Sequence, residues 1–231
     1  MNNYLENINE EQKLPVLHKD GPLIVIAGAG SGKTRVLTYR IIHLINEGVD
    51  PFNILALTFT NKAALEMKNR ISLITSESVS RSIWMGTFHS IFARILRSEA
   101  PLIGYPTNFT IYDTYDSEKL ISNIIKEKKL DKDTYKAKSI KNRISSLKNN
   151  FITVENYFNN SELIEVDKAA KRDLFGEIYQ EYVRRCFKAS VMDFDDLLVK
   201  TNELLNKSPE TLLKYQQKFK YILVDEYQDT N

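Results

Sequence analysis

Cysteine, histidine and long apolar runs are scarce in this chain of 231 residues. Its single cysteine, Cys186, excludes an internal disulfide and any cysteine-rich zinc site. The three histidines, His18, His43 and His89, lack the spacing of metal ligands. No apolar run approaches the roughly 18 residues of a membrane-spanning helix, and the first residues show no charged-then-apolar signal pattern. We therefore expect a cytoplasmic protein without a membrane partner.

A strong excess of one charge is also missing, because 32 Lys and Arg face 30 Asp and Glu for a net charge of +2. No global field therefore indicates nucleic acid, and any basic surface must be local. The hydrophobic share of 42% is ordinary for a globular protein. A chain of this length can bury a substantial core in one large domain or two small ones.

The most informative segment is Leu23–Thr34, where an apolar, strand-like run ends in a glycine-rich turn closed by Gly-Lys-Thr. Glycines let successive N–H groups point into one concavity that holds phosphate oxygens, and the following helix adds its positive N-terminus. Lys33 would reach the β- and γ-phosphates, and the Thr34 hydroxyl would ligate Mg²⁺. The alternative is a strand–helix turn without a ligand. The expected nucleotide contacts in the loop are Ala27 (in place of the usual glycine), Gly28, Ala29, Gly30, Ser31, Gly32, Lys33 and Thr34.

An acid that could hold the metal follows a second apolar run. Tyr221–Val224 is typical of a buried strand, and it delivers Asp225 and Glu226 at its carboxyl end. Ligands of open α/β sheets bind outside the carboxyl ends of the strands, so this end can reach the phosphate loop. We expect Asp225 to hold Mg²⁺ and Glu226 to position and deprotonate the attacking water. Acidic residues also end strands without any such role.

The first ninety residues alternate strand and helix patterns. Ile54–Phe59 and Ile83–Phe88 indicate strands, residues 34–47 have a one-face helical spacing, and Thr60 can cap a helix that follows it. This alternation predicts an α/β fold with a parallel sheet covered by helices. Residues 91–218 are mainly helical in period. The apolar positions of that period are Leu120, Ile124, Ile125, Ile140, Ile144, Leu147, Leu174, Ile178, Tyr182 and Phe187.

Five blocks of the sequence resemble the UvrD/Rep/PcrA-like superfamily 1 DNA helicases, most closely the PcrA branch. The resemblance runs from about Ile8 to the last residue. The blocks are Asn9–Gln12, the phosphate loop, Thr58–Ala64, Gly86–Ser90 and Asp225–Asn231.

This resemblance implies a RecA-like, P-loop NTPase lobe made of residues 1–90 and 219–231, interrupted by a mainly helical DNA-binding subdomain over residues 91–218. It implies an ATP-dependent helicase or translocase that moves 3′ to 5′, binds ATP with Mg²⁺, and acts on single-stranded DNA and duplex junctions. Roughly 190 residues between Lys33 and Asp225 agree with a large insertion, because a minimal nucleotide-binding lobe is shorter.

The resemblance also assigns roles to residues outside the loop. Gln12 is expected to prefer adenine, because an amide can donate to and accept from that base at once. Arg35 is expected to touch the nucleotide, although it could equally lie on the surface of the first helical turn. Phe59, Asn61, Thr87 and His89 are expected to line the DNA path. An aromatic at a strand end can stack on a base; the alternative for Phe59, and more so for Phe88, is core packing.

Two charged segments leave alternatives open. Tyr135–Asn150 contains five cations and no acid, and these side chains either contact DNA phosphates or form a solvated helix face. The cations are Lys136, Lys138, Lys141, Arg143 and Lys148. Asp193–Asp196 has paired carboxylates that suggest a second metal site, although N-capping of a helix explains them better.

The resembling helicases continue into a second motor lobe that sends arginines onto the γ-phosphate, and this lobe is missing from the 231 residues. We therefore expect an N-terminal fragment that binds Mg-ATP weakly and is nearly inactive alone, since such an arginine is worth roughly 10³–10⁵ in turnover. Two alternatives remain: a different phosphate-loop enzyme, such as a nucleotide kinase or transporter ATPase, and a non-catalytic DNA-binding module.

Overall fold

The protein was analysed as a computed structural model that describes residues 4–28 and 30–230. Backbone contacts divide the chain into two compact units, Met1–Ile91 with Glu210–Asn231, and Phe92–Pro209. The helix α5 (Phe88–Glu99) crosses the first boundary between them. Among the described residues, no helix combines the length and the apolar character needed to cross a membrane.

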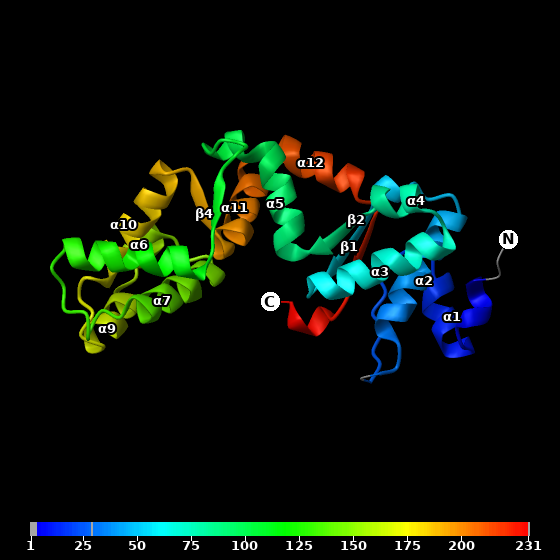
Figure 1. Ribbon diagram of the computed structural model, residues 1–231, viewed down its shortest axis with the longest axis horizontal. Helices are drawn as coiled ribbons and strands as arrows, with labels where there is room; N and C mark the ends of the chain where they lie inside the picture. Colours follow the sequence, from blue (N-terminus) through cyan, green and yellow to red (C-terminus); the bar gives the residue numbers. More distant parts are fainter. Residues whose placement is uncertain (1–3, 29, 231) are drawn as a thin grey trace. The chain divides into compact units, whose positions relative to one another are not determined.

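The first unit contains a parallel sheet with the strand order β2–β1–β5 (Figure 1). These strands are β1 (Ile54–Thr58), β2 (Trp84–Thr87) and β5 (Tyr221–Val224). Leu57 lies opposite both Gly86 and Val224 in the register. Because all three strands run the same way, their carboxyl ends meet at one edge of the sheet. Any residue that follows one of these strands therefore lies near the residues that follow the other two.

Helices cover this sheet through apolar side chains. Met67 and Ile71 of α3 pack with Ile54 and Ala56 of β1 in one buried cluster, to which α2 also contributes. Thr60 accepts a hydrogen bond from the N–H of Ala63, which confirms the predicted cap of α3. The helical elements of this unit are η1 (Tyr4–Asn7), α1 (Glu10–Leu17), α2 (Lys33–Asn46), η2 (Pro51–Asn53), α3 (Asn61–Ile74), α4 (Glu77–Ser82), α12 (Pro209–Lys218) and η4 (Tyr227–Asp229).

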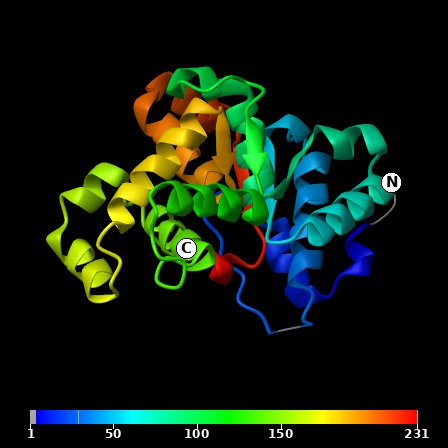
Figure 2. The same cartoon turned by 60° about the vertical axis from the view of Figure 1, so that its left-hand side comes forward.

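The apolar run before the phosphate loop departs from its prediction. Leu23–Ala27 forms no strand in the described part of the chain, and the segment runs as an irregular loop toward α2 (Figures 1 and 2). Its Ile24 and Ile26 side chains are 76% and 94% exposed. A strand exists only where a neighbour supplies a ladder of hydrogen bonds, and β5 pairs with β1 alone among the described strands. The strand prediction for this run is therefore wrong.

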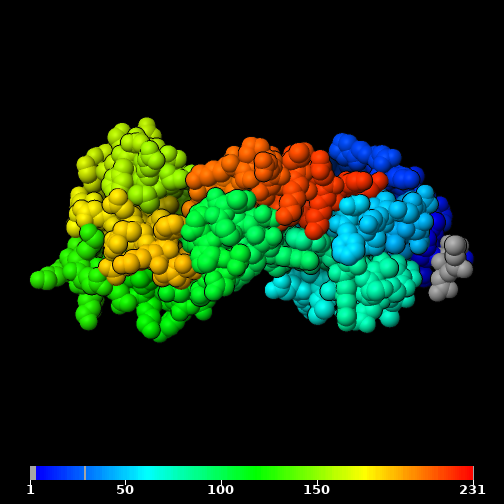
Figure 3. Space-filling model, turned by 90° about the horizontal axis from the view of Figure 1, so that it is seen from above, coloured from blue at the N-terminus to red at the C-terminus, as the bar shows by residue number. Residues whose placement is uncertain are grey.

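The second unit is mainly helical, with a small parallel sheet of β3 and β4. Helix α11 packs on η3, and Figure 3 shows these orange and green segments side by side. The elements are η3 (Ala100–Ile103), β3 (Thr110–Tyr112), α6 (Thr114–Glu127), α7 (Ala137–Asn149), α8 (Val154–Phe158), α9 (Ser161–Ala169), α10 (Phe175–Lys188), β4 (Val191–Asp193) and α11 (Phe194–Lys207).

The core of the second unit consists largely of the apolar positions that the helical period predicted. Ile124, Ile144 and Ile178 are buried together, one each from α6, α7 and α10. Phe187 is an exception, because its side chain is 51% exposed although it continues the period of α10. The lone cysteine, Cys186, lies in this core, where burial raises the pKa of its thiol to about 12. The thiol therefore stays protonated at neutral pH.

Candidate functional site

The glycine-rich loop curls tightly before α2 begins. Gly30 and Gly32 have φ angles of 77° and 90°, in the left-handed region that favours glycine. The Ser31 hydroxyl donates to the carbonyl oxygen of Gly28 over 2.7 Å, and the Ser31 N–H donates to the same oxygen over 3.3 Å. This turn leads directly into the positive N-terminus of α2. One predicted contact, Ala29, lies outside the described residues.

Lys33 is the first residue of α2, and its side chain reaches back over the loop. Its Nζ donates to the carbonyl oxygens of Ala27 over 3.2 Å and of Gly28 over 3.4 Å. The ammonium group thus lies beside the turn that the glycines form. A cation and a helix N-terminus at one turn suit a phosphate group.

Thr34 and Asp225 meet although they lie far apart in the sequence. The Thr34 Oγ1 donates to the Asp225 Oδ2 over 2.9 Å. Asp225 is 6% exposed, and its N–H donates to the carbonyl oxygen of Leu57 in the neighbouring strand. The pairing of β5 with β1 therefore fixes the position of Asp225 at the carboxyl end of the sheet. A hydroxyl and a carboxylate side by side are oxygen donors of the kind that Mg²⁺ prefers, so these residues fit that ion.

Glu226 follows Asp225 in a left-handed backbone conformation, with φ of 50°. Its N–H donates to the Asp225 Oδ1 over 3.1 Å. The Nε2 of Gln228 donates to the Oε2 of Glu226, which orients this carboxylate. Gln228 received no role in the sequence analysis. Its position in the Asp225–Asn231 block was the feature of the sequence that could have indicated a functional role. The structure adds that the turn of η4 brings its side chain back to Glu226.

Gln12 and Arg35, the two predicted nucleotide-binding residues outside the loop, both donate to backbone carbonyl oxygens of the protein. Gln12 donates from Nε2 to the Ser31 carbonyl oxygen over 3.0 Å, so it lies directly beside the loop. Arg35 donates to the carbonyl oxygen of Asn7, and its guanidinium lies 5.7 Å from the centre of the Tyr39 ring. The structure therefore brings Gln12 to the loop and directs Arg35 toward the N-terminal segment.

The predicted DNA residues gather at the carboxyl edge of the sheet. Phe59 directly follows β1 and is 61% exposed, so core packing does not hold it. Asn61 is exposed at the start of α3. Thr87 ends β2 opposite Thr58, and His89 follows as the second residue of α5. The strand prediction for Ile83–Phe88 is too long, since Phe88 already belongs to α5, where it is half-buried.

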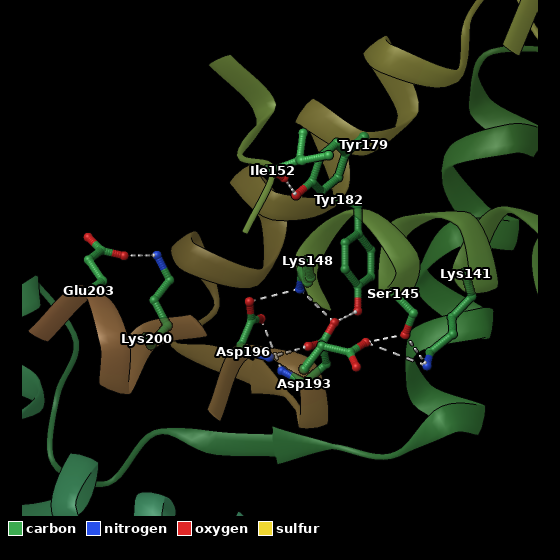
Figure 4. Close-up of polar contacts among 11 residues, drawn as sticks. Lys141, Ser145, Lys148, Ile152, Tyr179, Tyr182, Asp193, Asp196, Lys200 and Glu203 are labelled. Atoms are coloured by element: carbon green, nitrogen blue, oxygen red, sulfur yellow. Dashed lines mark hydrogen bonds and ion pairs between the residues drawn. The ribbon is translucent and has the colours of Figure 1, made fainter. Parts of the chain in front are cut away.

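In the basic stretch Tyr135–Asn150, three of the five cations neither form a solvated helix face nor remain available for DNA phosphates, because they pair with acids of the protein. Lys148 is 4% exposed, so it contacts neither solvent nor nucleic acid, and its Nζ lies 2.7 Å from Asp193 and 2.8 Å from Asp196 (Figure 4). Two further pairs, Lys141 with Asp195 and Arg143 with Asp167, use 3.7 Å and 3.1 Å contacts. Charges buried in this way require partners, and the acids of the same unit supply them. Lys136 and Lys138 are exposed.

The paired carboxylates of Asp193–Asp196 cap a helix, as the preferred alternative predicted. Asp193 accepts from the Asp196 N–H, and the Asp196 side chain accepts from the Asp193 N–H, which forms a reciprocal capping box at α11. Tyr182 also donates to Asp193, over 2.8 Å. Burial alone would lower the pKa of Lys148, but the two carboxylates outweigh it and raise that pKa. Lys148 therefore remains charged inside the unit.

This site defines a class of protein: an α/β fold in which a glycine-rich loop, closed by Gly-Lys-Thr at the start of a helix, lies beside an acidic residue at the carboxyl end of a parallel strand. The chain belongs to the UvrD/REP helicase family, because residues 8–231 match the UvrD/REP helicase N-terminal domain. The resemblance predicted from the motifs is thereby confirmed.

Three relatives are similar to this chain along its whole length. Each is an ATP-dependent DNA helicase PcrA: that of Bacillus subtilis (strain 168) is 45% identical, that of Staphylococcus epidermidis (strain ATCC 12228) 44%, and that of Staphylococcus aureus (strain NCTC 8325) 43%. The matches cover 100% of this chain but only 30% or 31% of each relative. The chain thus spans less than a third of the length of these relatives.

Proposed function

We propose that this chain is the nucleotide-binding portion of an ATP-dependent DNA helicase that moves 3′ to 5′ along single-stranded DNA and acts at duplex junctions. The observation that carries the proposal is the 2.9 Å contact between Thr34 and Asp225, which joins the start of α2 to the end of β5 beside the phosphate loop. The relatives, named as ATP-dependent DNA helicases, support ATP as the triphosphate.

In this proposal each side chain of the site has one task. The loop N–H groups and Lys33 hold the phosphates, and Thr34 with Asp225 holds Mg²⁺, which offsets the negative charge of the phosphate oxygens. Glu226 orients the attacking water and accepts its proton. Phosphoryl transfer depends mainly on positioning and electrostatics, so these few groups supply most of what one lobe can contribute.

DNA would lie along the carboxyl edge of the sheet, where Phe59, Asn61, Thr87 and His89 gather. The second unit would add phosphate contacts from its exposed cations. Lys136 of the basic stretch lines an open hollow together with Lys171 and Arg172, and this local basic surface supports sequence-independent binding.

A second motor lobe would complete the site of ATP hydrolysis. The relatives extend well beyond the matched portion, which supports a partner lobe on the remainder of the full protein. We propose that this lobe supplies an arginine to the γ-phosphate, a contribution of roughly 10³–10⁵ in turnover. The chain alone should therefore bind Mg-ATP but hydrolyse it slowly.

Mg-ATP is expected to raise the melting temperature of the chain. A ligand that binds only the folded state at about 100 times its Kd stabilises that state by about 2.7 kcal/mol. For a protein of this size the shift is about 5–10 °C. Differential scanning calorimetry measures it, with ATP plus EDTA and Mg-AMP as controls. A melting temperature that is the same with and without Mg-ATP would contradict the proposal.

Phe59→Ala is expected to weaken binding of single-stranded DNA by about 5- to 150-fold, because one base–aromatic stack contributes about 1–3 kcal/mol. Fluorescence anisotropy with a labelled oligonucleotide measures this. Phe52→Ala is a matched control, since Phe52 is 56% exposed against 61% for Phe59 but lies before the amino end of the same strand, in η2. Equal effects of the two variants would argue against a DNA path at the carboxyl edge.

A further inference from the structure

The short turn between β1 and α3 carries the exposed Phe59 and has a threonine on each side of it. Thr58 ends β1, and its hydroxyl donates to the carbonyl oxygen of Thr60 over 3.0 Å. Thr60 is the N-cap of α3, where its own hydroxyl accepts from the Ala63 N–H over 3.1 Å. The Thr60 carbonyl oxygen also accepts from the Ala64 N–H. One hydrogen bond therefore spans Phe59, from the residue before it to the residue after it.

Thr58 is inaccessible to solvent and to nucleic acid, because the residue is 0% exposed. The sheet fixes its position, since it lies opposite Thr87 of β2 in the register. A buried hydroxyl costs free energy unless it is hydrogen-bonded, and valine would fill the same space without that requirement. The partner here is the carbonyl oxygen two residues later in the chain. The Thr58 hydroxyl thus connects the end of a fixed strand to the start of a capped helix.

Phe59 lies between these two fixed residues and is 61% exposed. Because so little of the residue is covered, the position of its ring depends mainly on the backbone that carries it. Stacking on a base would order that backbone, and ordering a free residue on binding costs affinity. The hydrogen bond from Thr58 to Thr60 restricts this backbone before any ligand binds, so less ordering remains to be done.

We infer that Thr58 is a positioning residue for DNA binding, whose hydroxyl holds the turn so that the Phe59 ring is ready to stack on a base. This inference rests on the proposed function, in which DNA lies along the carboxyl edge of the sheet. Thr58 itself does not touch DNA and acts only through Phe59. Its contribution to DNA affinity therefore exists only while the Phe59 ring is present.

Thr58→Val is expected to weaken binding of a single-stranded oligonucleotide by roughly 5- to 30-fold, because the backbone of one freed residue must then be ordered on binding. Valine keeps the shape of threonine, and the Thr60 carbonyl oxygen retains the Ala64 N–H, so the fold should persist. Fluorescence anisotropy measures the affinity, and circular dichroism checks the fold. Wild-type affinity in the Thr58→Val variant would overturn the inference.

Two further variants show whether the hydroxyl is the cause. Thr58→Ser keeps the hydroxyl and should bind the oligonucleotide like the wild type; a loss as large as that of Thr58→Val would overturn the inference. Thr201→Val is the matched control in the second unit, because Thr201 is 2% exposed and its hydroxyl donates to the Leu197 carbonyl oxygen over 2.7 Å. It should leave DNA affinity unchanged, and a loss equal to that of Thr58→Val would also refute the role of Thr58.

The Phe59→Ala background separates a positioning role from a general structural one. There, Thr58→Val should change DNA affinity by less than about twofold, since no ring remains to be positioned. An equal loss with and without the ring would show that the hydroxyl supports the fold in general, and the inference would fail. If Phe59→Ala alone leaves DNA affinity unchanged, the DNA path of the proposed function fails. If Phe59→Ala weakens binding and Thr58→Val does not, only the inference fails.

Discussion

Lys33→Ala abolishes measurable Mg-ATP binding, if the loop holds phosphate as proposed. The variant removes the ammonium group whose Nζ lies 3.2 Å from the carbonyl oxygen of Ala27 and 3.4 Å from that of Gly28. Hydrogen bonds to charged groups contribute about 1.5–3 kcal/mol each, and two such bonds to the β- and γ-phosphates correspond to roughly 10²–10⁴ in affinity. Isothermal titration calorimetry with Mg-ATP measures the loss directly.

The control for this variant is Lys207→Ala, which removes the same charge from an exposed position of α11. It should leave Mg-ATP affinity unchanged, so that the net charge of the chain is excluded as the cause. Within the described part of the chain the Lys33 ammonium group donates to backbone carbonyls rather than to acids. Its loss therefore leaves no buried carboxylate without a partner, and the fold should persist. Circular dichroism checks this. Normal binding by Lys33→Ala would refute the assignment of the loop.

Lys148→Met is expected to destabilise the second unit by about 3–5 kcal/mol. Removing one partner of a buried ion pair leaves the other charge without compensation. Here two carboxylates, Asp193 and Asp196, would lose the cation that lies within 2.8 Å of both, while Tyr182 would still donate to Asp193. Methionine keeps the length and apolar stem of lysine, so the charge is the main difference. Urea unfolding followed by near-ultraviolet circular dichroism measures the change in midpoint.

Two further variants test the cause of that loss. Lys138→Met changes an exposed lysine of the same helix and should alter stability by less than about 0.5 kcal/mol. Combining Lys148→Met with Asp193→Asn and Asp196→Asn removes all three charges at once and should recover part of the stability, because no charge is left unpaired. A Lys148→Met chain as stable as the wild type would show that the buried contacts contribute little.

Local chemistry made several features predictable from the sequence. Helix caps are predictable at Thr60 and within Asp193–Asp196 because a short side-chain oxygen satisfies the N–H groups that a helix start leaves free. The proximity of Asp225 to the phosphate loop followed from a rule about parallel strands, which required only that Tyr221–Val224 be one of them. Each of these inferences depends on neighbours in sequence or on a general property of sheets.

Two features depended on partners that no local pattern identifies. Leu23–Ala27 has the composition of a buried strand, but the ladder that would make it one must come from elsewhere in the chain. Lys148 lies in a stretch without acids, and its partners, Asp193 and Asp196, follow about 45 residues later, at the end of β4 and the start of α11. The basic run predicted either phosphate contacts or a solvated helix face, whereas the chain uses two of its cations, Lys141 and Lys148, to hold the start of α11.

The late position of β5 has a consequence for synthesis on the ribosome. This strand pairs with β1, but about 130 residues lie between it and β2, which at 5–20 residues per second take on the order of ten seconds to translate. Until then one side of β1 is an uncovered template for strand pairing, and Thr34 has no carboxylate to meet. The nascent chain therefore emerges with two of the three strands of this sheet. The proposed magnesium ligands, Thr34 and Asp225, can come together only when translation has passed Asp225.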